Sequence, residues 1–331
     1  MLPLQREHIF FNLTTYPILI TFFFMNKKFV SLIASAGLLL TAAIWGFAFV
    51  VVKDSLDYIG SFYMVAIRFS IAAVGMGLIF FKKIKLIDRK HLLMGVVTGF
   101  FLFMGYLVQT IGCFYTTAGK NAFLTTVYVI LIPLISWPLY KKRPAIFVFI
   151  AAAMSMTGIG LLALGGNDFA RGGAGSGFNR GDVLTLLCGL FYALHILWTE
   201  KCNKEGCDVI IITMLQFFFA AIFGWISAPI ADGPFPLEVL QNSKVIVSML
   251  YLGLLSSMLC FSLQNIGLKY VQSSLASLFL SFESVFGVLF STIFLHEVLT
   301  LRMAFGCTLI FLAIILAENG NKLFNIHNDK F

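Results

Sequence analysis

Two charged residues lie inside long apolar stretches, where their chemistry would be unusual. Arg68 lies within residues 58–81 and Glu283 within residues 270–296, and neither stretch contains another Asp, Glu, Lys or Arg. A central arginine costs about 2.5 to 3.5 kcal/mol in a membrane-spanning helix, so Arg68 needs a partner. That partner is either a substrate carboxylate or phosphate, or a structural ion pair or lipid headgroup. Glu283 is the natural counter-charge for Arg68, and as a buried carboxyl it is also a candidate proton carrier.

Uncharged polar residues recur at helical spacing in a further apolar stretch. Asn121, Thr125 and Tyr128 are spaced i, i+4 and i+7 and therefore share one helix face. Pro133 follows, and we expect it to interrupt the helix. A kinked polar face is typical of a gate, although ordinary packing of small residues between helices gives the same pattern.

Matched positions in the two halves of the chain add further candidates. Gln109 and Gln264 each begin a Gln-x-Ile-Gly pattern, and Gln216 takes in the second half the place of Arg68 in the first. His195 either contributes to a cavity or is satisfied in a core. The predicted substrate-binding residues are Trp45, Arg68, Tyr106, Gln109, Asn121, Tyr128, Tyr192, His195, Gln216 and Gln264, with Glu283 as the candidate for proton coupling.

The composition indicates which elements must position these residues. Of the 331 residues, 60% are hydrophobic and only 11% are charged. Water-soluble domains carry about 25% charged residues. We therefore exclude a soluble protein and predict an all-α integral membrane protein.

Ten stretches have a length close to the roughly 20 apolar residues that a helix needs to cross a bilayer. They cover residues 29–52, 58–81, 91–119, 121–140, 144–167, 183–199, 209–231, 245–268, 270–296 and 301–317. The last is short for a crossing. Alternating strands of about ten residues, typical of a membrane barrel, are absent from the pattern.

Basic residues lie at the ends of these stretches and predict the orientation of the chain. Sixteen Lys and Arg fall in the flanks on the side of the N-terminus and six on the other side. Because basic flanks stay in the cytoplasm, we expect both termini to be cytoplasmic and the protein to lie in the cell inner (plasma) membrane. Nucleic acid is excluded as a partner. The expected partners are a small-molecule substrate and the lipid bilayer, and we expect a monomer or homodimer.

The second half of the chain repeats features of the first, and each half holds five stretches. Since five is odd, the second half must enter from the opposite side, which predicts two inverted five-helix repeats enclosing a cavity. Residues 1–28 are interpreted as an over-long start, an interfacial segment or an eleventh span. The predicted domains are this N-terminal segment, a first repeat at 29–164, a Gly-rich extracytoplasmic linker at 165–181, a second repeat at 182–318 and a cytoplasmic tail at 319–331.

Motifs for metal binding or catalysis are missing from the sequence. His296 and Glu297 begin like a zinc-protease helix, but Thr300 stands where the second histidine is required. The six cysteines are scattered without the spacing of a zinc site or a disulfide framework. We expect no cofactor, no metal and no enzymatic activity.

Several segments together resemble a known family. They are residues 42–53 (AAIWGFAFVVVK), Arg68, residues 118–133 (AGKNAFLTTVYVILIP) and the region of Glu283, His296, Glu297 and Leu299. The chain resembles the drug/metabolite transporter superfamily, EamA type, over residues 30–318. It departs from the usual pattern at Ser284, where the family often has proline, and at Lys141 and Lys142, which lie near the position matching Glu297.

The resemblance implies a secondary transporter, often an exporter, of small metabolites such as amino acids. Its cavity would lie between the two repeats and open alternately to either side. Two alternatives stay open. A lipid-carrier flippase would bind a phosphate at Arg68 and open laterally between apolar helices, and a membrane-embedded enzyme would need convergent acid and base groups.

Overall fold

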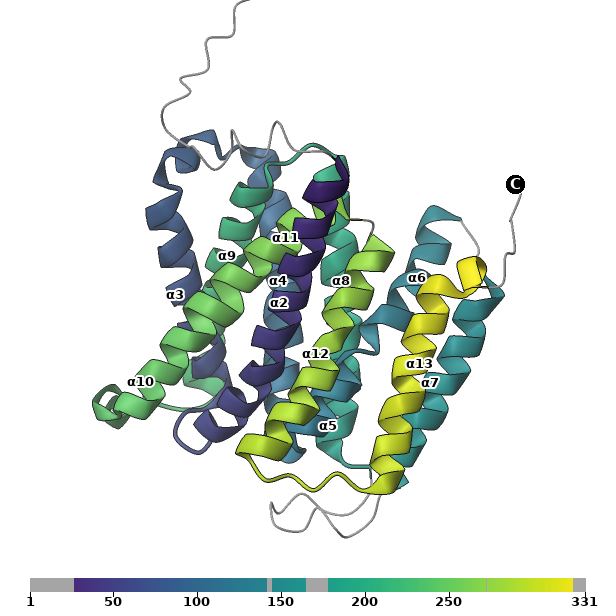
Figure 1. The fold of residues 1–331 in the computed structure, drawn as a ribbon. Coiled ribbons are helices and arrows are strands. Elements are labelled where there is room, and N and C mark those ends of the chain that lie inside the picture. Colours follow the sequence, from purple (N-terminus) through teal and green to yellow (C-terminus); the bar gives the residue numbers. More distant parts are fainter. Residues whose placement is uncertain (1–26, 142–144, 165–177, 272, 324–331) are drawn as a thin grey trace, which may run out of the picture.

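A computed structural model describes residues 27–141, 145–164, 178–271 and 273–323, which form helices and contain no strand (Figure 1). The predicted N-terminal segment (to residue 26), most of the Gly-rich linker and the end of the tail lie outside these ranges. The α-helices are α2 (Lys27–Ser55), α3 (Ser61–Ile79), α4 (Arg89–Tyr115), α5 (Ala118–Thr125), α6 (Tyr128–Tyr140), α7 (Ile146–Leu164), α8 (Arg180–Lys204), α9 (Val209–Ala231), α10 (Ser243–Leu250), α11 (Cys260–Tyr270), α12 (Ser273–Phe294) and α13 (Leu301–Leu323). Shorter turns are the 3₁₀ helices η1 (Phe81–Leu86) and η2 (Leu237–Gln241), and the π-helix η3 (Tyr251–Leu259) joins α10 to α11.

Seven helices in the described chain are long and apolar enough to cross a membrane. They are Val30–Ser55, Ser61–Ile79, Arg89–Tyr115, Ala118–Pro138, Arg180–Lys204, Val209–Ala231 and Ser243–Tyr270. Three shorter apolar helices accompany them, at Ile146–Gly158, Phe279–Phe294 and Ala304–Ala313. The protein is therefore an all-helical, multi-pass membrane protein. The last predicted stretch is longer than expected, because α13 continues to Leu323.

Polar side chains cap the helix starts, as a low-dielectric surrounding demands of exposed backbone groups. Asp88 caps α4 by accepting from the backbone N–H of His91 at 2.8 Å. Asn179 and Asp182 form a reciprocal capping box at the start of α8. Asp208 caps α9, and Thr117 caps α5. These four helices therefore begin where a short polar side chain can satisfy a free N–H, whereas α3 and α6 begin at Gly60 and Val127 without a side-chain cap.

The helix that carries Asn121 is broken, but not where the sequence predicts. The break between α5 and α6 falls at Thr126 and Val127, while Pro133 and Pro138 lie inside α6. At the break the backbone N–H groups of Thr126 and Val127 bond to carbonyls three residues earlier, at 3.2 and 3.3 Å. A tightened turn of this kind, rather than the missing N–H of proline, interrupts the helix.

Contacts between the halves of the chain organise the bundle. α3 packs along α9, and α7 packs along α13. α4 packs against α8, and α11 packs against α2. In addition, α2 lies along α12, and α8 contacts α5 and α6. Figure 1 shows α7 and α13 together at one side of the bundle and α3 at the other.

Small residues allow the closest of these approaches. Gly46 of α2 faces α12, where an added Cβ would lie 2.4 Å from the Cβ of Phe286 and 2.9 Å from the nitrogen of Gly287. Neither backbone could accommodate a larger residue, as is usual where membrane helices cross tightly. The α2–α12 contact, which forms one wall of the site described below, thus depends on glycine.

Two aspartates fasten α3 and α9 together at both ends. At one end Asp232 accepts from the backbone N–H groups of Phe62 and Tyr63, at 2.8 and 3.0 Å. At the other end Asp208 forms an ion pair with Lys83, which lies in η1 just after α3. α3, which carries Arg68, is therefore joined to α9 by a polar contact at each end.

Candidate functional site

A cavity with about 590 Å³ of empty space, open solvent included, lies between the two halves of the chain. Helices of both halves line it, α2 to α6 on one side and α8, η3, α11 and α12 on the other. Its lining consists of Trp45, Ala48, Phe49, Val52, Arg68, Tyr106, Gln109, Asn121, Tyr128, Tyr192, His195, Ile196, Ser256, Phe261, Gln264 and Glu283. All the residues that the sequence nominates, except Gln216, are brought together here.

Arg68 is buried in the lining of this cavity and has no carboxylate partner within the described part of the chain. Its Nε donates to the hydroxyl of Ser257 and its Nη2 to the hydroxyl of Ser256, both at 3.1 Å. Its guanidinium carbon lies 4.2 Å from the centre of the Tyr106 ring. Among the described residues no ion pair to Glu283 forms, so the expected counter-charge is replaced by hydroxyl dipoles and a ring face. The positive charge is thus left available to a ligand.

The two serines that hold Arg68 were not among the sequence candidates. They are adjacent residues in η3, the π-helix, and the indole N–H of Trp45 donates to the carbonyl of Ser256 at 2.7 Å. π-Helical turns leave carbonyls free and often occur at functional sites. The one signal in the sequence is a pair of serines inside the apolar stretch 245–268.

Gln109 is the centre of a hydrogen-bonded group that holds the broken helix. Its amide nitrogen donates to Thr125 at 3.0 Å, and its amide oxygen accepts from the Tyr192 hydroxyl at 2.9 Å. Asn121 donates to the backbone carbonyl of Gln109 at 3.2 Å and to the Thr185 hydroxyl at 2.8 Å. The polar face predicted on this helix therefore packs against α4 and α8 and places the amide of Asn121 at the cavity.

Glu283 and Gln264 supply less satisfied polar groups. Glu283 is 4% exposed, and the hydroxyl of Tyr128, which lines the same cavity, has no hydrogen-bond partner among the described residues. The amide nitrogen of Gln264 is buried and has no hydrogen-bond partner among the described residues. Gln109 and Gln264 match in sequence, yet among the described residues only the amide nitrogen of Gln109 has a hydrogen-bond partner. The second is free to bond a ligand.

His195 lines the cavity, and Gln216 lies behind it. The imidazole Nε2 is 3.0 Å from the amide oxygen of Gln216, and the ring packs edge-on against Phe261 with centroids 5.7 Å apart. Gln216 is fully buried and is not part of the lining. It therefore does not match Arg68 as a cavity residue, and it orients the histidine instead.

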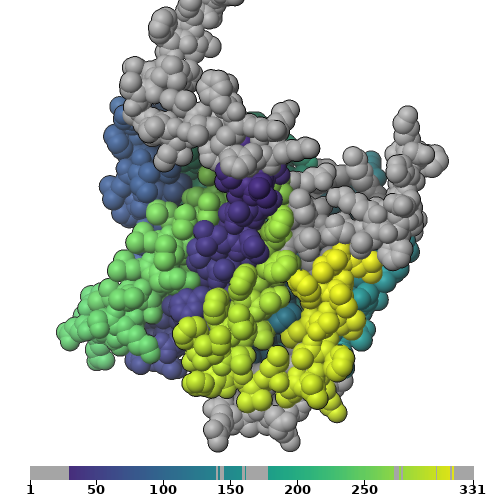
Figure 2. All heavy atoms as spheres, viewed as in Figure 1, coloured from purple at the N-terminus to yellow at the C-terminus, as the bar shows by residue number. Residues whose placement is uncertain are grey.

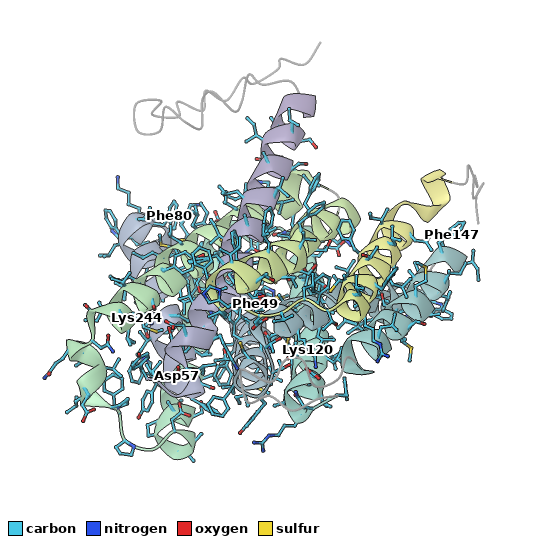
Figure 3. The ribbon with its side chains drawn as sticks, turned by 60° about the horizontal axis from the view of Figure 1, so that its bottom comes forward. Phe49, Asp57, Phe80, Lys120, Phe147 and Lys244 are labelled. Carbon is cyan, nitrogen blue, oxygen red and sulfur yellow. The ribbon has the colours of Figure 1, made fainter. Side chains whose placement is uncertain are left out.

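Charged residues lie at one end of the bundle, and two of them, Lys53 and Lys120, fall within the segments that carry the family resemblance. Lys53 donates to the carbonyls of Cys113 and Thr116 at the end of α4, each at 2.8 Å. Lys120 and Asp182 form a buried ion pair of 2.7 Å. Phe49 packs against α5 at this end, which Figure 3 brings forward with Phe49 and Lys120 labelled.

Glu297, from the second half of the chain, also contacts the start of α5 at this end of the bundle. Its carboxylate accepts from the backbone N–H groups of Ala118 and Gly119, at 2.8 and 3.0 Å. These N–H groups begin α5, where a helix dipole favours negative charge. His296, with a φ of 54°, turns the chain so that Glu297 reaches them. The start resembling a zinc-protease motif is thus part of a helix cap.

Comparison with known proteins identifies this arrangement. The EamA-like transporter family matches the chain twice, at residues 32–164 and 179–318. The chain belongs to the EamA-like transporter family. The family is part of the drug/metabolite transporter superfamily, which the sequence resemblance predicted.

Relatives cover most of the EamA-like chain. An uncharacterized transporter of Archaeoglobus fulgidus is 37% identical over 288 residues, covering 87% of this chain and 86% of its own. The uncharacterized transporter YoaV of Bacillus subtilis is 24% identical, covering 85% and 94%. A crystal structure of a protein matches with a TM-score of 0.64 at 16% identity, over 88% of this chain and 98% of that chain, which supports the fold alone.

Proposed function

We propose that this membrane transporter is a secondary transporter, working as an exporter of small metabolites such as amino acids. The observation that carries the proposal is the cavity itself. It is lined both by the buried guanidinium of Arg68, which has no carboxylate partner among the residues that the structure describes, and by the buried carboxyl of Glu283. Polar and charged groups inside a membrane protein are expensive and usually mark a pathway. In a family of transporters, that pathway is the route of the substrate.

The proposed mechanism is alternating access between two inverted five-helix repeats, ten crossings in all. Two family matches, one in each half, support the repeat. The helix contacts support it as well, if α2, α3, α4 and α7 correspond to α8, α9, α11 and α13. Under that correspondence the α4–α8 contact has its counterpart in the α11–α2 contact, and the α3–α9 and α7–α13 contacts each join two corresponding helices. Both termini would then face the cytoplasm, with the protein in the inner membrane, as the distribution of basic residues favours.

The two charges in the cavity favour a substrate that carries both signs. Arg68 would bind a carboxylate, since its remaining N–H groups match that geometry. Glu283 and Tyr128 would receive a protonated amine, and rings of Trp45 and Phe261 would contact the side chain. The same substrate would also satisfy the free amide of Gln264.

Proton exchange at Glu283 would couple transport to a gradient. A carboxyl buried beside the cavity can hold a proton in one state and an amine in the other. The substrate gradient alone is the other source of energy that fits this site.

Metabolite profiling of cells with and without the protein, followed by uptake of the leading compound into proteoliposomes, tests the proposal. The expected result is saturable uptake that is accelerated when the interior of the proteoliposomes is acidic, so that protons flow outward. In Glu283→Gln, substrate should still exchange across the membrane, but the proton gradient should no longer accelerate its uptake. Arg302→Gln, an exposed change in α13, is the matched control and should behave as wild type. If none of the compounds whose levels change is taken up, the transporter proposal is overturned. If uptake by Glu283→Gln depends on the gradient as it does in wild type, proton coupling is overturned.

A further inference from the structure

The short helix η1 exposes apolar and basic side chains together. It links α3 to α4 at the end of the bundle opposite α5 (Figure 1). Phe81, Ile84 and Leu86 are 60%, 48% and 62% exposed. In Figure 2 the blue part of the chain, which includes α3, lies at the surface on one side of the bundle. Three large apolar side chains on six residues are too many for a segment that faces only water.

The period of a 3₁₀ helix sorts these side chains into edges. With three residues per turn, positions i and i+3 lie one above the other. Phe81 and Ile84 therefore form an apolar edge, and Lys82 and Lys85 form the basic edge beside it. Because α3 and α4 are both candidate membrane spans, η1 lies where the hydrocarbon of the bilayer gives way to headgroups.

Within the described chain, some of the basic side chains in this segment form an ion pair with a carboxylate, and others do not. Lys83 is paired with Asp208, which ties η1 to the start of α9. Lys82, Lys85 and Arg89 are exposed and have no carboxylate partner among the described residues. The neighbouring Asp88 is occupied by the backbone and ring of His91, at 2.8 and 2.7 Å. Three positive charges are therefore left uncompensated beside an apolar edge.

We propose that η1 and the start of α4 form a binding site for anionic phospholipid headgroups, with Lys82, Lys85 and Arg89 as the ligands of the phosphate. Phe81 and Ile84 enter the upper acyl region and hold the basic edge at headgroup depth. The Lys83–Asp208 pair fixes the site to the α3–α9 pair, so a bound lipid contacts the helix that carries Arg68. The site is independent of what the cavity transports.

Lipid quenching of an introduced indole tests the site. Full-length Phe81→Trp protein is reconstituted in equimolar phosphatidylglycerol and phosphatidylcholine, with bromine on one lipid or on the other. Quenching of the parent protein, which has its own tryptophans, is subtracted. Three exposed cations should enrich phosphatidylglycerol near the indole by roughly threefold or more, and added salt should reduce the enrichment.

Charge variants in the Phe81→Trp background locate the effect. Lys82→Gln/Lys85→Gln/Arg89→Gln should remove the enrichment, whereas Lys82→Arg/Lys85→Arg should keep it. The matched control, Lys201→Gln/Lys204→Gln/Lys269→Gln, removes the same charge elsewhere and should also keep it. An indole quenched equally by both lipids, an enrichment that survives in the triple η1 variant, or an equal loss in the control would overturn the proposal. Because these side chains are exposed or, at Lys201, half-buried, a helical circular dichroism spectrum should confirm that every variant folds.

Discussion

The guanidinium of Arg68 lies 4.2 Å above the centre of the Tyr106 ring, so an aromatic face takes the place of a carboxylate beside a buried arginine. Tyr106 belongs to α4 and Arg68 to α3, and their contact is completed by the serine hydroxyls of η3. A ring stabilises a cation without neutralising it. The charge of Arg68 is therefore kept in place and kept available.

Tyr106→Leu should weaken substrate binding because it removes this ring. A desolvated cation–π contact is worth about 2 kcal/mol, so the KM for uptake should rise roughly tenfold or more. Tyr106→Phe keeps the ring and should stay near the wild-type KM. Concentration-dependent uptake into proteoliposomes measures both, and an unchanged KM in Tyr106→Leu would count against the role of the ring.

Lys120→Met should destabilise the protein strongly, because it leaves Asp182 buried without its cation. Removing one member of a buried pair typically costs about 3 to 5 kcal/mol. Adding Asp182→Asn should restore part of the loss, since Thr116 can still bond the side chain at that position. The thermal midpoint in detergent reports these changes. Lys244→Met, which breaks the exposed pair with Asp54, should leave the midpoint nearly unchanged.

Glu297→Ala should loosen the closed end of the bundle. Its carboxylate bonds the first N–H groups of α5 from the opposite half of the chain, so its loss frees α5 from the α12–α13 loop. We expect a cysteine introduced at Phe49, in a background without the native cysteines, to react several times faster with a membrane-impermeant maleimide in Glu297→Ala. Glu297→Gln keeps an acceptor and should lie between. Equal labelling rates in all three proteins would refute this closure.

Acid should remove the stabilisation that Asp208 provides outside the membrane. Burial alone would raise the pKa of this carboxyl, but Lys83 and the N–H groups of Ile211 and Ile210 outweigh it and hold the pKa below its ordinary value of 3.8. A lowered folded-state pKa contributes stability that is present above 3.8 and is lost as the pH falls through the folded-state value. The midpoint difference between wild type and Asp208→Asn should therefore be full at neutral pH and shrink in acid below 3.8. A difference that grows on acidification would contradict the sign of this effect.

The sequence predicts most of the cavity because polar residues in apolar stretches have few places to go. Arg68, Gln109, Asn121 and Glu283 are costly in lipid, and each faces the same interior space. Helix positions follow equally well from the length of the apolar runs. These predictions require only that the chain lies in a lipid bilayer, and they do not depend on how its helices pack.

The remainder depends on tertiary contacts that no local pattern carries. The partners of Arg68 come from a π-helical turn nearly 190 residues later, at Ser256 and Ser257. Lys120 looks like a flanking charge until Asp182 is brought against it across the fold. Pro133 is a strong local signal, yet the helix breaks earlier because Thr126 and Val127 satisfy the backbone with a tighter turn.

Equilibrium binding of the transported metabolite to purified protein tests the central role of Arg68 most directly. Isothermal titration in detergent should give a Kd that rises at least about tenfold in Arg68→Gln, because the carboxylate loses a charge-assisted bond. Ser284→Ala, a buried change in α12 away from the lining, should bind as wild type does. A folded Arg68→Gln protein that binds the metabolite with wild-type affinity would contradict the assignment of this cavity as the substrate site.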